Sequence, residues 1–223
     1  MALAQKAKIQ NPTLKLVLRV VEFIVLFFGI PLLIYFDREW TLPTILILPV
    51  LVFIFLILKH TTDFRFRELI SWDISRSLVQ RSTLVVSLCM LLMLGYVYFF
   101  ERENLFNLPR RHPWIFFAMC VFYPVFSAFG QEIIYRTFLY RRYGLLFRKP
   151  WQFVLASGIT FSFVHIVYYD PVSMILTLVG GLYFARMYLE TRSVLFTTVL
   201  HGVLGIIVFA VGMGQYFWLD MPM

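Results

Sequence analysis

The chain has 223 residues, of which 61% are apolar and 14% are charged, and its mean hydropathy is +0.80. This composition argues against an ordinary soluble domain, in which about 25% of the residues are charged. The net charge of +8 fits nucleic-acid binding in general, but the basic residues are placed as a membrane-topology signal, so we expect no nucleic-acid partner.

Several apolar stretches reach the ~20 residues with which a helix crosses ~30 Å of hydrocarbon. The first of them has no small-residue cleavage site, so we expect it to stay in the mature protein. No linker or internal repeat interrupts the chain, which predicts one integral membrane domain over 1–223. We predict an all-α polytopic protein with about seven spanning helices in one bundle, at 17–36, 41–58, 83–100, 113–140, 151–169, 171–189 and 194–217.

The basic residues gather on one side of these predicted spans. Sixteen of the twenty Lys and Arg residues fall in segments 1–19, 59–82, 136–149 and 186–192. The positive-inside rule therefore places the N-terminus in the cytoplasm and the C-terminus outside. In segment 59–82, arginines alternate with aromatic and aliphatic residues, which suggests a short amphipathic segment on an anionic membrane face. We interpret Arg141 and Arg142 as topology anchors.

Ionisable side chains at membrane depth are costly and normally face a partner, a cavity or a substrate path. Three places qualify, and they contain Gln131, Glu132, Arg136, His165 and His201. Glu132 and Arg136 have the i, i+4 spacing of an ion pair on one helical face, which in isolation could equally be a pair that only neutralises two charges.

The two histidines lie among small and polar residues. Gly158, Ser162 and His165 form a stripe at steps of four and three, which faces other helices rather than lipid. His201 follows two threonines by one turn. Alone, each histidine is more often an interhelical hydrogen-bonding group than a catalyst.

The expected positions of these groups along their helices place them close together. If one helix continues to about Phe147 and the next begins near Trp151, Glu132 and His165 lie ~23 and ~21 Å from the turn and face each other across a hairpin. We therefore expect Glu132, His165 and His201 to surround one polar, water-accessible pocket in the cytoplasmic half, open toward the cytoplasm. A carboxylate and two imidazoles there suit water activation, as a general base with hydrogen-bonding groups or as metal ligands.

These motifs resemble the CAAX protease and bacteriocin-processing family, or Abi family, of intramembrane glutamic endopeptidases. The family pattern is a Glu-Glu-x-x-x-Arg helix, a Phe-x-x-x-His helix and a later His that Asn or Asp commonly follows four residues on. The corresponding residues here are Gln131, Glu132, Arg136, Phe161, His165, His201 and Gly205. The resemblance predicts a protease-like core over 113–217.

The resemblance implies hydrolysis of a peptide bond near the membrane surface by a water that a glutamate and a histidine activate. The second histidine and its neighbouring amide would stabilise the oxyanion. It also implies membrane lipid and a peptide or membrane-tethered protein as partners, and an integral protein of a bacterial inner (plasma) membrane.

Two positions depart from the family pattern. Gln131 stands where the family has its first glutamate, and an amide cannot accept a proton at neutral pH. Gly205 replaces the usual Asn or Asp. Three explanations remain: a subgroup that uses Glu132, which we favour because Glu132 and both histidines persist, a catalytically silent relative, or an inactivating substitution. A pocket that Gln131 enters in place of Glu132 would favour the silent relative.

Two other classes of function remain open. A non-catalytic binding or immunity protein would keep the fold and the substrate groove, whereas a small proton-coupled transporter would use the same ionisable groups as a relay. We expect no cofactor. A zinc site is the less favoured alternative, because no His-x-x-x-His or HExxH motif is present in the sequence and the ligands would come from three separate helices.

The charge distribution predicts opposite sides of the membrane for the two termini. A reporter that is active only in the cytoplasm should be active when fused to the N-terminus and inactive when fused to the C-terminus. Equal activity of the two fusions would mean that the number of spans is even.

Overall fold

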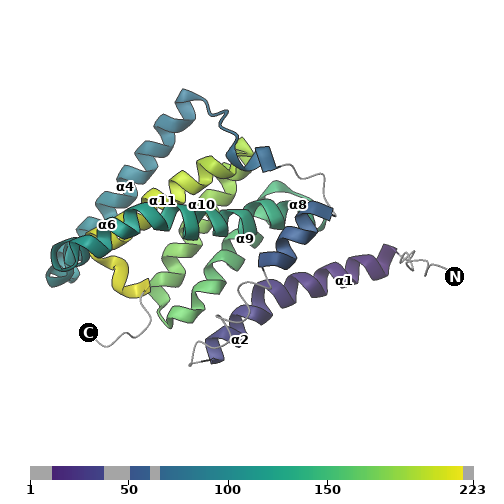
Figure 1. Ribbon diagram of the computed structural model, residues 1–223, viewed down its shortest axis with the longest axis horizontal. Helices are drawn as coiled ribbons and strands as arrows, with labels where there is room; N and C mark the ends of the chain where they lie inside the picture. The colour runs from purple at the N-terminus through teal and green to yellow at the C-terminus, as the bar shows by residue number, and fades with distance from the viewer. Residues whose placement is uncertain (1–11, 38–50, 61–65, 218–223) are drawn as a thin grey trace.

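The computed structural model describes residues 12–37, 51–60 and 66–217, and these residues form helices and short connections without any strand. The prediction of an all-α protein is therefore confirmed (Figure 1). Its α-helices are α1 (Pro12–Ile24), α2 (Ile30–Phe36), Leu51–His60, α4 (Arg76–Phe100), α5 (Asn107–Arg111), α6 (Pro113–Phe122), α7 (Phe129–Glu132), α8 (Leu139–Tyr143), α9 (Pro150–Val164), α10 (Pro171–Thr191) and α11 (Val194–Val211). The shorter π and 3₁₀ segments are η1 (Val25–Gly29), η2 (Phe66–Ile70), η3 (Arg102–Asn104), η4 (Tyr123–Ala128), η5 (Ile133–Phe138), η6 (Gly144–Leu146), η7 (His165–Tyr168) and η8 (Met213–Phe217).

Within the described residues, six continuous helices are long and apolar enough to cross a membrane. They are Pro12–Phe36, Arg76–Phe100, Pro113–Leu146, Pro150–Tyr168, Pro171–Thr191 and Val194–Val211. Many large apolar side chains on them are exposed, as hydrocarbon-facing surfaces require.

The second predicted span, 41–58, is not among these six helices and lies partly outside the described residues. Its described end belongs to the helix Leu51–His60, which buries Ile54 and Leu58 against the bundle. These two residues are spaced i, i+4 and so lie on one helical face. Seven spans and the orientation in the membrane stay predictions.

The connection that was predicted over 59–82 is shorter in the structure. Helix α4 begins at Arg76, seven residues earlier than expected, because the Ser75 hydroxyl accepts a hydrogen bond from the Leu78 amide and caps the helix. Between His60 and α4, the described part of the predicted amphipathic segment is helical only in η2.

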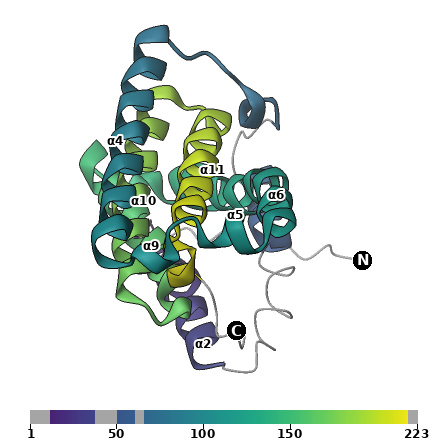
Figure 2. The ribbon, with the colours of Figure 1, turned by 90° about the vertical axis from the view of Figure 1, so that its left-hand side faces the viewer.

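The segments α6 to α8 form one long rod that crosses the other helices (Figure 1). In Figure 2, α11 lies between this rod and α4, and it contacts both. Two stretches of the rod, η4 and η5, are π-helical, with α7 between them. Pro124 in η4 has no backbone N–H to donate, which is a common cause of such a local change in winding. π-Helical turns are rare and concentrate at functional sites.

Helices α9 and α10 pack closely because glycines meet at their crossing. A Cβ on Gly158 would lie 2.6 Å from Leu182 Cδ2, and one on Gly181 would lie 3.1 Å from Gly158 Cα. The Ser162 hydroxyl donates to the Met174 carbonyl at 2.7 Å, which adds a cross-helix hydrogen bond. The prediction that the Gly158–Ser162 stripe faces another helix is confirmed.

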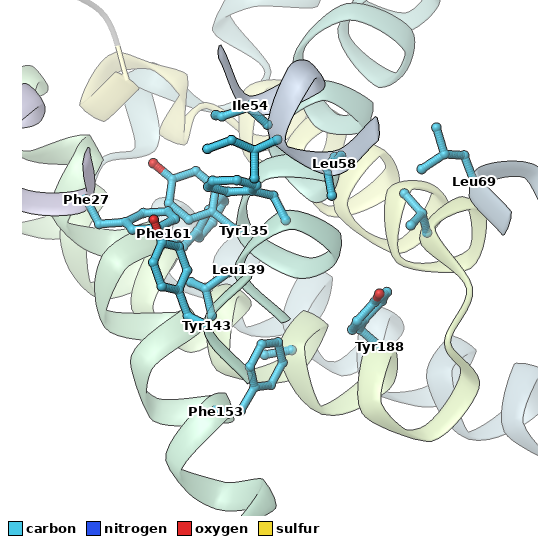
Figure 3. Packing of buried hydrophobic residues seen from close by; sticks show 14 residues of the cluster. Phe27, Ile54, Leu58, Leu69, Tyr135, Leu139, Tyr143, Phe153, Phe161 and Tyr188 are labelled. Carbon is cyan, nitrogen blue, oxygen red and sulfur yellow. The ribbon is translucent and has the colours of Figure 1, made fainter. Parts of the chain in front are cut away.

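An aromatic cluster joins α1 and η1 to the rod and to α9 and α10 (Figure 3). Phe27, Tyr135, Tyr143 and Phe161 are among its buried members, and several ring pairs meet edge to face. Such contacts add to the apolar burial and fix the relative positions of the helices.

An ion pair beside this cluster was not expected from the sequence. Arg142 donates from Nε and Nη2 to the two carboxylate oxygens of Glu22 at 2.9 and 2.7 Å, and the Tyr143 hydroxyl donates to the same carboxylate at 2.7 Å. Arg142 therefore fastens α1 to the rod, a role that was not predicted from the sequence, and its role as a topology anchor stays a prediction. Glu22 was overlooked although it is a charged residue inside an apolar stretch.

Replacing Glu22 with Gln should destabilise the protein by about 1–3 kcal/mol, because it removes the charge from a bidentate pair that is only 17% and 22% exposed. The midpoint of thermal unfolding in detergent measures the effect. Glu103→Gln, at an exposed position, is the control. Equal midpoints for both variants would show that the pair contributes nothing.

Candidate active site

The five predicted site residues lie on three helices. Gln131 and Glu132 end α7, between the two π-helical stretches, and Arg136 lies in η5. His165 follows α9, and His201 lies about two turns into α11. The expected hairpin is present, because the rod is helical to Leu146 and α9 begins at Pro150.

Glu132 is fully buried between Arg136 and His201. Arg136 Nε donates to Oε2 at 3.0 Å, and His201 Nδ1 lies 3.0 Å from Oε1. The predicted i, i+4 ion pair is confirmed, and both of its side chains are 0% exposed. One carboxylate thus pairs with a guanidinium on its own helix and with an imidazole on α11.

Other contacts of Arg136 reach α9. Its Nη1 donates to the Ser157 hydroxyl, which itself donates to the Tyr135 carbonyl at 2.7 Å. The guanidinium lies 5.2 Å from the centre of the Phe161 ring. Arg136 therefore connects the rod to α9. Its side chain is enclosed by protein groups and does not face the solvent.

A cavity of ≈ 440 Å³ lies beside this network. Gln131, His165 and His201 line it, so the prediction that both histidines meet at one pocket is confirmed. For Glu132 the prediction is wrong: its carboxylate points to Arg136 and His201 and is not part of the lining, and Gln131 enters the cavity instead. This position of Gln131 favours the silent relative over a subgroup that uses Glu132 as its base. The direction in which the cavity opens relative to a membrane stays a prediction.

The hydrogen bonds of the two histidines indicate which nitrogen of each ring carries a hydrogen. His165 Nδ1 is 2.7 Å from the Phe161 carbonyl, and a carbonyl can only accept, so Nδ1 carries hydrogen. In the neutral ring, Nε2 then has a lone pair and no hydrogen bond to any described residue. His201 Nδ1 must likewise donate if the Glu132 carboxylate is ionised. The His201 ring stacks on Phe184, with centroids 5.0 Å apart.

Gln131 contributes a neutral amide to the cavity. Its Nε2 donates to the Ser127 hydroxyl at 3.0 Å, while its Oε1 has no partner among the described residues. An amide can accept and donate hydrogen bonds, but it cannot take a proton from water at neutral pH.

The rest of the lining is mostly apolar, so the prediction of a polar pocket is wrong for most of its wall. It includes residues from the middle of α4 and from α10 and η8, such as Leu92, Met93, Val179 and Phe217. The cavity therefore has a polar region at the rod and α11 and a larger apolar region at α4 and α10. This combination is typical of pockets for ligands with a long apolar part and a few polar atoms.

Two functional candidates were missed from the sequence. The Tyr123 hydroxyl lies 3.1 Å from His201 Nε2 and lines the cavity, and Ser157 is the partner of Arg136. A tyrosine in the middle of an apolar span is a signal, because a buried hydroxyl needs a partner. The residue with which it pairs cannot be read from the sequence.

Within the part of the chain that the structure describes, no group of three or more His, Cys, Asp or Glu side chains is placed to hold a metal ion. The metal-independent chemistry expected above stays a prediction. Cys89 and Cys120 are both free.

Comparison with known proteins identifies the segment that carries the site. The family model described as type II CAAX prenyl endopeptidase Rce1-like matches residues 113–207. This range holds all five predicted site residues, and the resemblance drawn from their motifs is confirmed. No curated protein and no solved structure matches the chain.

Replacing Glu132 with Gln should destabilise the protein by about 3–5 kcal/mol, because Arg136 would keep a buried charge without a counter-ion. The control is Glu190→Gln, which removes the Arg81–Glu190 pair at 3.2 Å; its side chains are 65% and 34% exposed, and it should cost about 0–1 kcal/mol. Thermal unfolding in detergent compares the two variants. A loss for Glu132→Gln no greater than that of the control would contradict the buried-charge argument.

Proposed function

We propose that the protein hydrolyses a peptide bond of a membrane-tethered substrate inside the cavity beside α7. The match of residues 113–207 to the family model of Rce1-like type II CAAX prenyl endopeptidases supports this proposal. The observation that carries the proposal is the joining of Gln131, His165 and His201 in one cavity although they come from three helices. We place the protein in a bacterial plasma membrane.

The substrate is a peptide that carries a lipid chain or an apolar tail. The large apolar region of the cavity supports this class, because it gives such a chain a place next to the polar groups. The peptide bond would then lie at Gln131 and the two histidines. Membrane lipid surrounds the exposed apolar faces of the spans.

The base in this mechanism is His165. Gln131 cannot accept a proton, and both oxygens of Glu132 are engaged by Arg136 and His201 away from the cavity. His165 Nε2 has a lone pair because Nδ1 donates to the Phe161 carbonyl. It takes a proton from water, the hydroxide adds to the peptide carbonyl, and the same imidazolium returns the proton to the leaving amine.

Gln131 stabilises the tetrahedral intermediate in this proposal, and His201 positions the groups beside it. The amide of Gln131 can donate toward the carbonyl oxygen, and His201 is held in place by Glu132. Glu132 and Arg136 act as positioning residues in this proposal. No metal or cofactor takes part in it.

A silent relative that only binds the peptide is the second candidate. The observation that favours it is the position of Gln131, an amide at the cavity wall where the family pattern has a glutamate. Such a protein would hold a lipid-tethered peptide, as an immunity or sequestering protein does, without cleaving it.

Hydrolysis of a fluorescent lipid-anchored peptide in liposomes tests both candidates. His165→Ala should lower the rate at least ~100-fold, because general bases typically contribute 10²–10⁴. His112→Ala changes an exposed histidine outside the cavity and should leave the rate unchanged.

The Gln131→Glu variant separates the candidates. Cleavage by the parent chain with loss on His165→Ala supports the endopeptidase. Cleavage only after Gln131→Glu supports the silent relative, because the added carboxylate would supply the missing base. A His165→Ala variant with full activity would overturn the proposed mechanism.

A further inference from the structure

The phenol of Tyr123 fills the space beside His201 that a side chain at position 205 would need. Gly205 follows His201 by one helical turn on α11, and Tyr123 begins η4 on the rod. A Cβ on Gly205 would lie 2.5 Å from Tyr123 Oη and 2.6 Å from Cζ. Any other residue at 205 would therefore displace the ring.

A second glycine allows the same close approach. A Cβ on Gly202 would lie 3.1 Å from Pro124 Cβ, so the rod meets α11 at two positions without side chains on α11. This contact brings the Tyr123 hydroxyl to 3.1 Å from His201 Nε2. Glycines at helix crossings permit such close packing in membranes.

Glu132, His201 and Tyr123 form a chain of hydrogen bonds that ends at the cavity. The carboxylate lies 3.0 Å from His201 Nδ1, and the Tyr123 hydroxyl lies 3.1 Å from Nε2 of the same ring. When His201 is an imidazolium, both its nitrogens donate, and Nε2 donates to the phenol oxygen. The phenol hydrogen is then free to donate into the cavity, which Tyr123 lines.

We propose that the Tyr123 hydroxyl, oriented by His201, contacts the carbonyl oxygen of the bound peptide, and that Gly205 is its matched partner because it leaves room for the ring. The inference rests on the proposed peptide site and adds the group that recognises the carbonyl. His201 is a positioning residue in this arrangement, while the phenol donates the hydrogen bond.

The first experiment removes only the hydroxyl. In a chain that cleaves, Tyr123→Phe should lower kcat about 100-fold and change KM less than threefold, because a donor to the developing oxyanion acts mainly in the transition state. Tyr98→Phe, on the exposed face of α4, is the control and should leave kcat unchanged. Unchanged kcat in Tyr123→Phe would overturn the proposal.

The second experiment moves the donor to position 205. Gly205→Asn alone should lower the unfolding midpoint and the rate because the new side chain collides with the Tyr123 ring. Combining it with Tyr123→Ala removes the collision. The double variant should be at least tenfold faster than Tyr123→Ala alone. Additive losses in the double variant would contradict the matched pair.

One further measurement applies whether or not the chain cleaves, and another applies to a chain that does not cleave. The ¹⁵N NMR shift of His201 Nε2 in labelled protein should change in Tyr123→Phe and not in Tyr98→Phe, and an unchanged shift would overturn the hydrogen bond. If the parent is silent, affinity for an uncleaved lipid-anchored peptide replaces kcat. Tyr123→Phe should then weaken binding about 3- to 10-fold, as the loss of one hydrogen bond predicts, and equal affinity would reject the carbonyl contact.

Discussion

The carboxylate of Glu132 is the constraint on which the arrangement of the site depends. It is 0% exposed, and a buried charge persists only when its partners are fixed around it. One oxygen takes Arg136 from its own helix and the other takes His201 from α11. Because Arg136 also donates to Ser157 on α9, three helices are held at one point and the cavity forms beside it.

The local winding of the rod decides which side chain enters the cavity. In a regular α-helix neighbouring residues point about 100° apart, and each π-helical turn holds an extra residue that rotates everything beyond it. Gln131 and Glu132 lie between two such stretches. Sequence periodicity therefore predicted the cluster of polar groups and the i, i+4 ion pair, but it could not assign the cavity to Gln131.

Hydropathy located most of the fold because length and apolar content decide which helices can cross a membrane. Contacts between segments far apart in the sequence were harder to predict. Arg142 and Glu22 are 120 residues apart, and no periodic pattern relates them. Tyr123 and Gly205 were missed as a pair for the same reason: the glycine was noted as a departure from a motif, whereas its cause is the volume of a ring on another helix.

The charge balance of the site explains why a glutamine at 131 is compatible with the fold. Arg136 already neutralises Glu132, so the buried pair carries no net charge beside the cavity wall. A second carboxylate at 131 would add an anion to an apolar cavity, which costs free energy unless His165 or His201 is protonated. An amide avoids that cost and keeps the hydrogen bond to Ser127. In the proposed mechanism, a glutamine at 131 leaves no carboxylate base at the cavity wall, so proton transfer from water would depend on the lone pair of His165, which the hydrogen bond to the Phe161 carbonyl places on Nε2.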